Sequence, residues 1–484
     1  MIIDGAILAA GFGTRMASPL PKVESVVLGE TLLSYPWRAL LSLGSRLDTI
    51  HVVVRPEGFL GDPGLSDPNG RKPAFVVQPV MDGTWGAVEA VAQSKPFRSG
   101  KATHLLVVNG DGPLLDESLL ERFASLGEAL PEALCLATAE LADPRGYGRI
   151  LRNAEGSVID IREESRASEE EKRIHEVNAG IYLIPREILL SALSRIPPDP
   201  VKKERFLTTL VSWVVSHGGA VHTFPMTPEC MLGVNTQEEL ATVTALLRER
   251  INRRHMERGV TLWDPARTDI GPRVEIGAGT VVMPQTVLEG ATRIGASCRI
   301  GMGVHLTDTV AGTKVTVRDF VVATEARLRD GSVIGPFAHL RPGTDLGEES
   351  HIGNFVETKK TVVGPKSKVN HLSYLGDAEV GSHTNIGAGT ITCNYDGYEK
   401  HRTRIGSGVF VGSDTQIVAP VRIGDRSVIA AGSTVTSDVP DDALMLSRAS
   451  QEIRPEGGAR YHRRRGERSA NKNGPGAPKK KGQE

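Results

Sequence analysis

The sequence predicts two domains of different class, an α/β Rossmann-like domain followed by a left-handed parallel β-helix. Up to about residue 235, short apolar runs alternate with longer amphipathic stretches. Beyond about residue 260, Ile-Gly or Val-Gly pairs recur along the chain, most often with a spacing of six positions or a multiple of six. A chain of 484 residues is also long enough for two or three domains.

In the first half, five apolar runs have the length and composition of strands: GAILAA, TIHVVVR, AFVVQPV, HLLVVNGD and VNAGIYLI. The stretches between them, such as TLLSYPWRALLSLG and DESLLERFASLG, have helical periodicity. This alternation predicts a mostly parallel sheet covered by helices on both faces. Ligands bind such sheets at the carboxyl ends of the strands, where glycines and an aspartate follow ILAAG and LLVVN.

A single long amphipathic helix is predicted to connect the halves, because apolar residues recur at helical spacing in QEELATVTALLRERINRRHMERG. The predicted organisation is a domain at 1–236, a linker helix at 237–259, a β-helix at 260–450 and a basic tail at 451–484. From Arg460 onwards the tail has nine Lys or Arg against two Glu and almost no apolar residues. This composition predicts disorder.

The second half has the period of a parallel β-helix, in which each short strand forms one side of a triangular coil. Three of the repeated units close one coil, so every third unit returns the same side chain one coil higher. Two segments, 339–377 and 390–406, carry His, Lys, Asn, Tyr and Arg where small or aliphatic residues would otherwise be favoured. We expect these segments to be functional loops that interrupt the stack.

Composition and targeting signals predict a cytoplasmic protein without disulfides. The four cysteines are far apart and form no CxxC pair, and the chain shows no secretory signal. No apolar stretch approaches the ~20 residues of a transmembrane segment. The net charge is −1. The basic tail is compatible with a nucleic-acid or membrane contact, but a solvated end is the simpler interpretation, and no specific nucleic-acid partner is predicted.

The segment ILAAGFGTRMASPLPK indicates a phosphate-binding loop outside the two standard patterns. Met16 stands where a dinucleotide fingerprint has its third glycine, and no GK[ST] follows. Arg15 and Lys22 would together clamp a polyphosphate. Asp111, just after an apolar strand, is either a turn residue or a ligand for Mg²⁺. Together these residues favour phosphoryl or nucleotidyl transfer.

Longer motifs add a specific resemblance. The stretch LAAGFGTRM with its downstream PK is similar to the sugar-nucleotidyltransferase signature, and the family's order is followed by VVQPVMDGTWGAV, NGDGPL, DPRGYGRI, IREES, VNAGIY and LGVN. The second half contains RPGTDLGEESHIGNFVETKK, NHLSYLGDAEVGSHTNIGAGTITCNYDG and VFVGSDTQIVAPVRIG. Over about residues 1–450 the chain resembles the bacterial family of bifunctional N-acetylglucosamine-1-phosphate uridylyltransferase/glucosamine-1-phosphate acetyltransferases.

For the first half, the resemblance implies Mg²⁺-dependent uridylyl transfer from UTP to N-acetylglucosamine 1-phosphate, with release of pyrophosphate. Arg15 and Lys22 would bind the triphosphate, and Asp111 and Asn235 would hold Mg²⁺. The residues implied for the uracil and ribose are Leu8, Ala9, Ala10, Gly11, Gln78, Gly83 and Thr84. Those implied for the amino sugar are Gly148, Glu163 and Asn178.

For the second half, the resemblance implies transfer of an acetyl group from acetyl-CoA to the amine of glucosamine 1-phosphate within a homotrimer. His371 would be the base, a role for which imidazole is suited near neutral pH. The implied sugar-phosphate ligands are Arg341, Lys359, Tyr374 and Asn385. The implied acetyl-CoA ligands are Ala388, Asn394, Tyr395, Ser413, Ala431 and Arg448.

The first half also departs from the family pattern at positions that border the two pockets. Met81 stands where a second glutamine is usual, Gly86 where His is frequent, and Asn109 where Tyr is common, and the lysine usual after Glu163 is missing. These departures keep one alternative open: a sugar-1-phosphate nucleotidyltransferase of different specificity, for example glucose 1-phosphate with UTP or dTTP, in which the β-helix is only a trimerisation scaffold.

Overall fold

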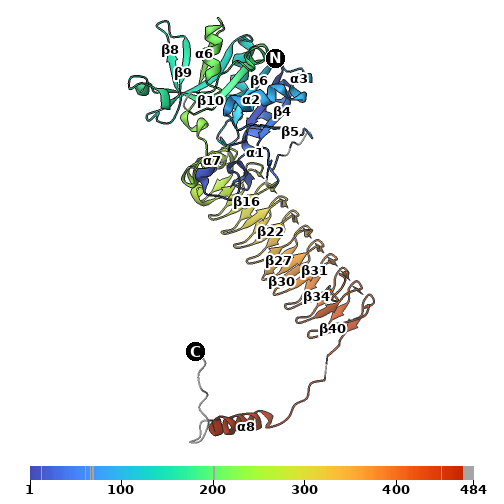
Figure 1. Cartoon of the computed structure of the whole chain (residues 1–484). Helices are drawn as coiled ribbons and strands as arrows, with labels where there is room; N and C mark the ends of the chain where they lie inside the picture. The colour runs from blue at the N-terminus through green and yellow to red at the C-terminus, as the bar shows by residue number, and fades with distance from the viewer. Residues whose placement is uncertain are drawn as a thin grey trace.

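The computed structural model describes residues 1–11, 13–59, 61–65, 67, 70–199, 202–448 and 450–472. The N-terminal α/β domain lies at one end of a long, straight β-helix (Figure 1). Both predicted fold classes are therefore confirmed.

The N-terminal domain is built on a mixed sheet with the strand order β11-β7-β10-β6-β1-β4-β5. Strands β6, β1, β4 and β5 are parallel, whereas β10 runs antiparallel to both β6 and β7. A hairpin, β8 (Arg149–Arg152) and β9 (Val158–Arg162), extends from β10. The strands of the main order are β1 (Ile3–Leu8), β4 (Leu47–Val54), β5 (Ala74–Val77), β6 (His104–Asn109), β7 (Leu134–Glu140), β10 (Glu176–Pro185) and β11 (Val221–Pro225).

Helices cover both faces of this sheet, and each face has its own apolar core. Along β1, Ile3 and Ile7 pack against α1 (Ser34–Leu41) and α4 (Glu117–Ala129) on one face. On the other face Ala6 packs with α2 (Thr84–Gln93), α5 (Arg186–Ala192) and α6 (Thr209–Ser216). The short α3 (Lys95–Ser99) follows α2. This period-two division of β1 is why an almost continuous apolar run forms a strand buried on both sides.

The carboxyl ends of β1 and β6 bring two distant loops together. The strands are parallel neighbours, and Leu8 at the end of β1 pairs with Asn109 at the end of β6. At Gly110 a Cβ would lie 2.9 Å from the Leu8 carbonyl oxygen, so the close approach of the loops needs a glycine there. The glycine-rich loop after β1 therefore faces the segment that carries Asp111.

The β-helix consists of three parallel sheets of 11, 10 and 9 short strands, running from β12 (Thr261–Leu262) to β41 (Leu444–Met445). Its core is a stack of aliphatic side chains. Ile276 pairs with Ile294, as the strict period of three repeated units requires, but Ala311 pairs with Leu328, one position short of that period. The coil thus tolerates corners that are slightly shorter than the strict period.

Only one of the two expected interruptions is an insertion. Val380 pairs with Ile405, which lies much farther along the chain than one ordinary coil, so this coil contains an extra loop around residues 394–402. Across 339–377, in contrast, the strands keep the ordinary spacing; for example, Ile352 pairs with Val369. The expectation of a loop there was wrong, because the polar residues occupy outward positions of regular coils and leave the inward aliphatic positions unchanged.

Helix α7 (Gln237–Glu257) joins the domains and is fixed to both. It begins with a capping box between Thr236 and Glu239. Arg250 donates to the Leu114 carbonyl at 2.8 Å in the α/β domain. Asn252 donates at 2.7 and 2.9 Å to the carbonyls of Pro265 and Thr268, at the start of the β-helix.

A second contact ties the hairpin β2 (Val26–Val27) and β3 (Glu30–Thr31) to the β-helix. The buried carboxylate of Glu30 accepts from Arg273 of the first coil at 2.5 Å and pairs with Arg38 of α1 at 3.3 Å. One buried anion with two cationic partners therefore spans the domain junction.

The tail differs in part from its prediction of disorder over 451–484. Residues Gly457–Lys472 form helix α8, at the end of an extended segment that leads away from the β-helix (Figure 1). The excess of Lys and Arg and the lack of apolar residues predicted disorder, but Arg, Ala and Glu are good helix formers and need no apolar face for local helix formation. Residues 473–484 lie outside the described residues. Among the helices of the described part, none has the length and apolar character needed to cross a membrane.

His255 makes the junction sensitive to pH. His255 is 2% exposed on α7, and neither ring nitrogen has a hydrogen-bond partner among the described residues. Burial, together with Arg254 and Arg258, lowers its pKa from 6.5 to about 4. The unfolded chain therefore binds this proton at a higher pH than the folded chain does. We expect stability to fall between about pH 6.5 and 4, by up to roughly 3 kcal/mol from this group. His255→Leu should flatten that part of the pH dependence in urea unfolding; an unchanged slope would contradict the assignment.

Candidate functional sites

The first site is centred on Lys22, which lies on the short helix η2 (Lys22–Glu24). Its ammonium contacts the Asp111 carboxylate and donates to the Asn235 side-chain oxygen at 3.0 Å. Asp111 follows β6, and Asn235 lies just before α7. The structure thus brings three predicted residues together from segments that are 89 and 213 positions away from Lys22 in the chain.

The two oxygens that hold the Lys22 ammonium form a donor set that fits a divalent cation such as Mg²⁺. A carboxylate and an amide oxygen converge on one cation, and hard divalent cations prefer oxygen ligands. Within the described ranges, no cluster of three or more His, Cys, Asp or Glu has metal-binding geometry. A divalent cation held there by Asp111 and Asn235 would need further oxygen ligands, of the kind that substrate phosphates and water provide.

The glycine-rich loop closes directly on Lys22. Gly13 has φ +62°, and a Cβ there would lie 2.9 Å from the Lys22 Cβ. Arg15 follows on η1 (Thr14–Met16) and is exposed. In the described part of the chain, no hydrogen bond or ion pair links Arg15 to the other predicted residues, so the structure leaves this predicted ligand outside the cluster.

A cavity of about 310 Å³ lies beside Lys22 and contains most of the residues predicted for the nucleotide. Ala9 is the exception, since it is 6% exposed and packs into the core below the loop. Met81, one of the departures from the family pattern, also lines this cavity. The predicted lining residues are Leu8, Ala10, Gly11, Gln78, Gly83 and Thr84.

A larger cavity of about 760 Å³ adjoins it and contains the predicted sugar ligands Gly148, Glu163 and Asn178. Asp111 lines both cavities and marks the place where they meet. At Gly148 a Cβ would lie 2.8 Å from the Ile161 side chain, so only glycine fits without a shift.

Two residues of the sugar cavity were missed from the sequence. Thr208 donates from its hydroxyl to Glu163 at 2.7 Å and so orients that carboxylate. Tyr182 is 1% exposed, and within the described ranges its hydroxyl makes no hydrogen bond of ordinary geometry, although the Asn178 side chain lies close to it. Burial raises the pKa of this phenol well above its ordinary value, which keeps it a neutral hydrogen-bond donor. Tyr182 lies within a strand-like apolar run, so nothing local distinguished it from a core residue.

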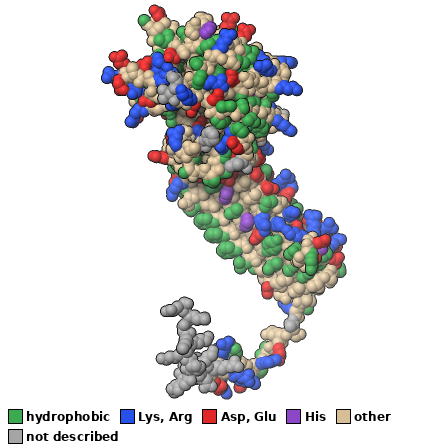
Figure 2. All heavy atoms as spheres, viewed as in Figure 1, with side chains coloured by type: hydrophobic (Ala, Val, Ile, Leu, Met, Phe, Trp, Pro, Cys, Tyr) green, Lys and Arg blue, Asp and Glu red, His purple; other side chains and the backbone are tan. Residues whose placement is uncertain are grey.

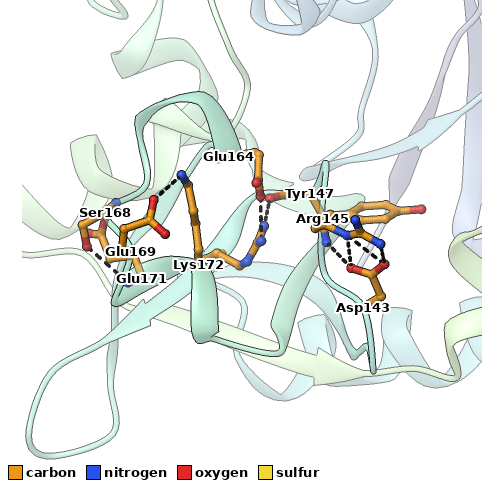
Figure 3. Close-up of polar contacts among 9 residues, drawn as sticks. Asp143, Arg145, Tyr147, Glu164, Ser168, Glu169, Glu171 and Lys172 are labelled. Atoms are coloured by element: carbon orange, nitrogen blue, oxygen red, sulfur yellow. Dashed lines mark hydrogen bonds and ion pairs between the residues drawn. The ribbon is translucent and has the colours of Figure 1, made fainter.

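Ion pairs fix the loop that carries Gly148. The guanidinium of Arg149, with its side chain 1% exposed, pairs with Glu164 at 2.6 Å and donates to the Tyr147 carbonyl. Figure 3 shows Glu164 between two other ion pairs, Lys172 with Glu169 on one side and Arg145 with Asp143 on the other. Because Glu164 follows Glu163 directly, the buried arginine also holds the backbone of the predicted sugar ligand.

The second site lies on a corner of the β-helix. Asn354 ends β27 (His351–Asn354) and His371 ends β30 (Lys368–His371), and the two residues are partners in adjacent coils. The side-chain oxygen of Asn354 lies 2.8 Å from Nδ1 of the exposed His371. An amide oxygen can only accept, so His371 carries its proton on Nδ1 and presents Nε2 outward. Asn354 was missed, although it stands one coil below His371.

Positive charge gathers beside this corner. Lys359 at the end of β28 (Glu357–Lys359) lies against Lys400 of the inserted loop, and the neighbouring ammonium lowers the pKa of Lys359. Arg341 adds a third cation and pairs with Glu357 at 2.9 Å. Figure 2 shows blue side chains gathered on this part of the β-helix. Like charges held together in this way form an anion site, and Lys400 is a member that the sequence analysis missed.

The remaining predicted sugar-phosphate ligands flank the corner. Tyr374 begins β31 (Tyr374–Gly376), shortly after His371, and pairs with Glu357 in the sheet that carries Lys359. Asn385 begins β33 (Asn385–Ile386) on the other side of the corner and pairs with Lys368. The corner therefore presents His371 between the two faces that carry these ligands.

The residues predicted for acetyl-CoA form a column above His371. Ile386, Val411 and Ile429 are paired in neighbouring coils. Two positions after each of them stands a predicted ligand: Ala388, Ser413 and Ala431. Arg448 donates to the Ala431 carbonyl at 2.8 Å at the far end. Small side chains therefore occupy the same position in consecutive coils.

The inserted loop beside this column carries the other two predicted acetyl-CoA ligands. Asn394 is buried and donates to Asp377 at 2.6 Å, whereas Tyr395 is 60% exposed and donates to the Gly397 carbonyl at 2.6 Å. The structure thus places Tyr395 at the surface and uses Asn394 to anchor the loop.

Comparison with known proteins agrees with this two-site architecture. Residues 5–178 match the family model of the MobA-like NTP transferase domain, and residues 402–437 match that of the bacterial transferase hexapeptide (six repeats). The relatives named bifunctional protein GlmU from Sorangium cellulosum, Trichlorobacter lovleyi and Methylococcus capsulatus are 43%, 43% and 44% identical over 453 residues. These alignments cover 93% of this chain and 94%, 97% and 96% of the relatives.

The chain belongs to the bifunctional GlmU family. It is a bifunctional transferase with an N-terminal nucleotidyltransferase domain and a C-terminal hexapeptide-repeat domain. As a family member it departs from the usual pattern at Gly86, and the structure gives a reason. A Cβ at Gly86 would lie 1.8 Å from Oδ1 of Asp82, so an acidic side chain occupies the space that a larger residue at position 86 would need.

The Lys22 ammonium should compete with a divalent cation for the oxygens of Asp111 and Asn235 when no nucleotide is bound. Lys22→Met removes that positive charge, so we expect the affinity for Mn²⁺ alone to rise by about tenfold, measured by electron paramagnetic resonance titration. Asp111→Asn in the same assay should abolish binding. Equal Mn²⁺ affinity in the wild type and Lys22→Met would show that the ammonium does not occupy the cation position.

Proposed function

We propose that the chain makes UDP-N-acetylglucosamine in two steps. The β-helix transfers an acetyl group from acetyl-CoA to the amine of glucosamine 1-phosphate. The α/β domain then transfers uridylyl from UTP to the N-acetylglucosamine 1-phosphate formed. The observation that carries the second step is the convergence of Lys22, Asp111 and Asn235 where the two cavities meet. The four free cysteines accord with action in the reducing cytoplasm.

In the uridylyl step, the smaller cavity takes the nucleoside and the larger one takes the sugar. The sugar phosphate oxygen attacks the α-phosphorus of UTP in line, and pyrophosphate leaves. Lys22 moves from Asp111 onto the triphosphate as charge develops on the leaving group, and the exposed Arg15 closes over the same phosphates. Mg²⁺ held by Asp111 and Asn235 would neutralise phosphate charge. Glu163, oriented by Thr208, holds the sugar.

In the acetyl step, His371 takes the proton from the glucosamine amine through Nε2 as the nitrogen attacks the thioester carbonyl. Asn354 fixes the tautomer that leaves Nε2 free. Lys359, Lys400 and Arg341 neutralise the sugar phosphate. The tetrahedral adduct collapses to the amide as its C–S bond breaks, and the protonated His371 returns the proton to the sulfur, so that CoA leaves as the thiol.

A homotrimer accounts for an otherwise exposed apolar ladder. Phe320, Phe337 and Phe355 stack on successive coils, with ring centroids 5.1 and 5.5 Å apart, and Leu372 continues the column one coil higher. These side chains are 45–63% exposed and stand next to the column of Asn354 and His371. Neighbouring subunits packed along this corner would bury the ladder and would also enclose the column of residues predicted for acetyl-CoA. Sedimentation equilibrium should give the mass of three chains; a monomer at micromolar concentration would contradict this assembly.

The alternative of a different nucleotide or sugar preference is tested by the same assay as the leading proposal. Purified protein is supplied with UTP, dTTP, CTP or ATP and with N-acetylglucosamine, glucosamine or glucose 1-phosphate, and pyrophosphate release is followed. We expect UTP with N-acetylglucosamine 1-phosphate to give the highest kcat/KM. Preference for glucose 1-phosphate would support the alternative instead.

The two activities should be separable, because their sites lie in different domains and share no described residue. Asp111→Asn, or removal of divalent cations by EDTA, should lower pyrophosphate release by at least about a hundredfold. Acetyl transfer, followed by release of free thiol, should continue at the wild-type rate. Simultaneous loss of both activities would contradict independent sites.

Asn354 should act through His371. His371→Ala should lower kcat for acetyl transfer by about a hundredfold or more, the range of general base catalysis. Asn354→Ala should lower kcat by a smaller factor, about tenfold, with little change in the KM for glucosamine 1-phosphate. In the double variant the effect of Asn354→Ala should disappear; additive losses would show that Asn354 acts independently of the imidazole.

A further inference from the structure

An ion-pair chain lies behind the nucleotide cavity, and the family resemblance does not account for it. Arg205 bonds the loop before α2 through its backbone: its N–H donates to the Asp82 carbonyl at 2.5 Å, and its carbonyl accepts from Trp85 at 2.9 Å. Its guanidinium lies between two carboxylates, at 2.7 Å from Asp82 and 2.6 Å from Glu89. The three side chains are only 10–22% exposed, so this chain is far better shielded from water than an ordinary surface salt bridge.

Asp82 also contacts Gln78, one of the residues predicted to bind the uracil and ribose. The side-chain nitrogen of Gln78 donates to the Gly83 carbonyl at 3.0 Å and to Oδ1 of Asp82 at 3.4 Å. Both partners can only accept, which settles which end of the amide is the nitrogen. The Gln78 carbonyl oxygen is therefore the end left for a ligand, and no donor in the described part of the chain reaches it. Gln78 lines the cavity.

The contact between Asp82 and Gln78 requires a glycine at position 86. A Cβ there would lie 1.8 Å from Oδ1 of Asp82 and 3.1 Å from the Gln78 nitrogen. Any larger residue at position 86 would displace the carboxylate from the amide. Gly86 and Asp82 thus work as one unit, and Arg205 and Glu89 hold the carboxylate in place from the other side.

We propose that Asp82, held by Arg205 and Glu89, is the positioning residue that fixes the Gln78 amide and so selects nucleotides whose base carries an imide N–H. This inference rests on the proposed function of the smaller cavity. A fixed carbonyl oxygen accepts from the N3–H of uracil or thymine. It opposes the lone pair on N3 of cytosine, and a buried acceptor facing another acceptor is costly.

The test compares kcat/KM for UTP, dTTP and CTP, with pyrophosphate release as the readout. The wild type should favour UTP and dTTP over CTP. Asp82→Ala removes one of the two acceptors that orient the amide and leaves only the Gly83 carbonyl. The amide can then turn its nitrogen toward cytosine at a lower cost, so the UTP/CTP ratio should fall by about tenfold or more. Asp82→Asn keeps an acceptor for Gln78 and should restore part of the ratio. Gly86→Ala should lower the ratio by displacing the carboxylate while leaving it in the chain.

Glu176→Ala is the matched control, because Glu176 forms a similarly shielded pair with Arg152 at 2.6 Å on the strands β8 and β10. Its UTP/CTP ratio should equal that of the wild type. Equal losses for UTP and CTP in Asp82→Ala and Gly86→Ala would show a merely structural role and overturn the inference. A wild type that prefers CTP would also overturn it. If the sugar panel instead identifies another sugar phosphate, only the proposed function fails, and the ratio is measured with that sugar.

Discussion

The ammonium of Lys22 is the contact around which the N-terminal site is organised. It joins the glycine-rich loop, the end of β6 and the segment before α7, and its side chain is the point where polar groups from all three converge. Without it, two electron-rich oxygens would face each other in a half-buried place. The same oxygens suit a divalent cation, so we propose that the site exchanges one positive charge for another when a charged substrate binds. Asn235 lies just before α7, and the other end of that helix is fixed to the β-helix, so the cluster around Lys22 stands at one end of the domain connector.

The two sites were predictable to different degrees, because they are assembled in different ways. In the β-helix, position in the sequence almost equals position in space: a residue three repeated units away, or one position fewer, lies one coil above or below. The steps from Asn354 to His371, from His371 to Ala388 and from Ser413 to Ala431 follow that rule. The step from Ala388 to Ser413 does not, because it crosses the inserted loop. Lys400 was also outside the reach of the rule, because it comes from that loop, whose path no repeat dictates.

In the α/β domain the sequence predicted the sheet, its ligand-binding edge and the glycine-rich loop, but not the contacts made by side chains far apart in the chain. Asp82 and Arg205 are 123 residues apart. The sequence showed Gly86 only as a departure from the family pattern, a glycine where His is frequent. Asp82 and Arg205 come into contact only when folding packs the segment around residue 205 against the loop before α2. Tyr182 is similar, because its apolar neighbours predict a core strand correctly and thereby conceal a polar group.

The two sites also differ in how well their charges are shielded from water and salt. The charges around the nucleotide cavity are mostly shielded from water within a single chain. Solvent screens these ion pairs only weakly, so each pair interacts strongly. The cations at the β-helix corner lie on an open surface, where water and salt weaken their hold on a phosphate. The apolar ladder beside them supplies the remedy, since a second subunit drawn onto Phe337 and its neighbours would also exclude water from Lys359 and His371. Assembly and acetyl-site affinity are then two consequences of burying one corner.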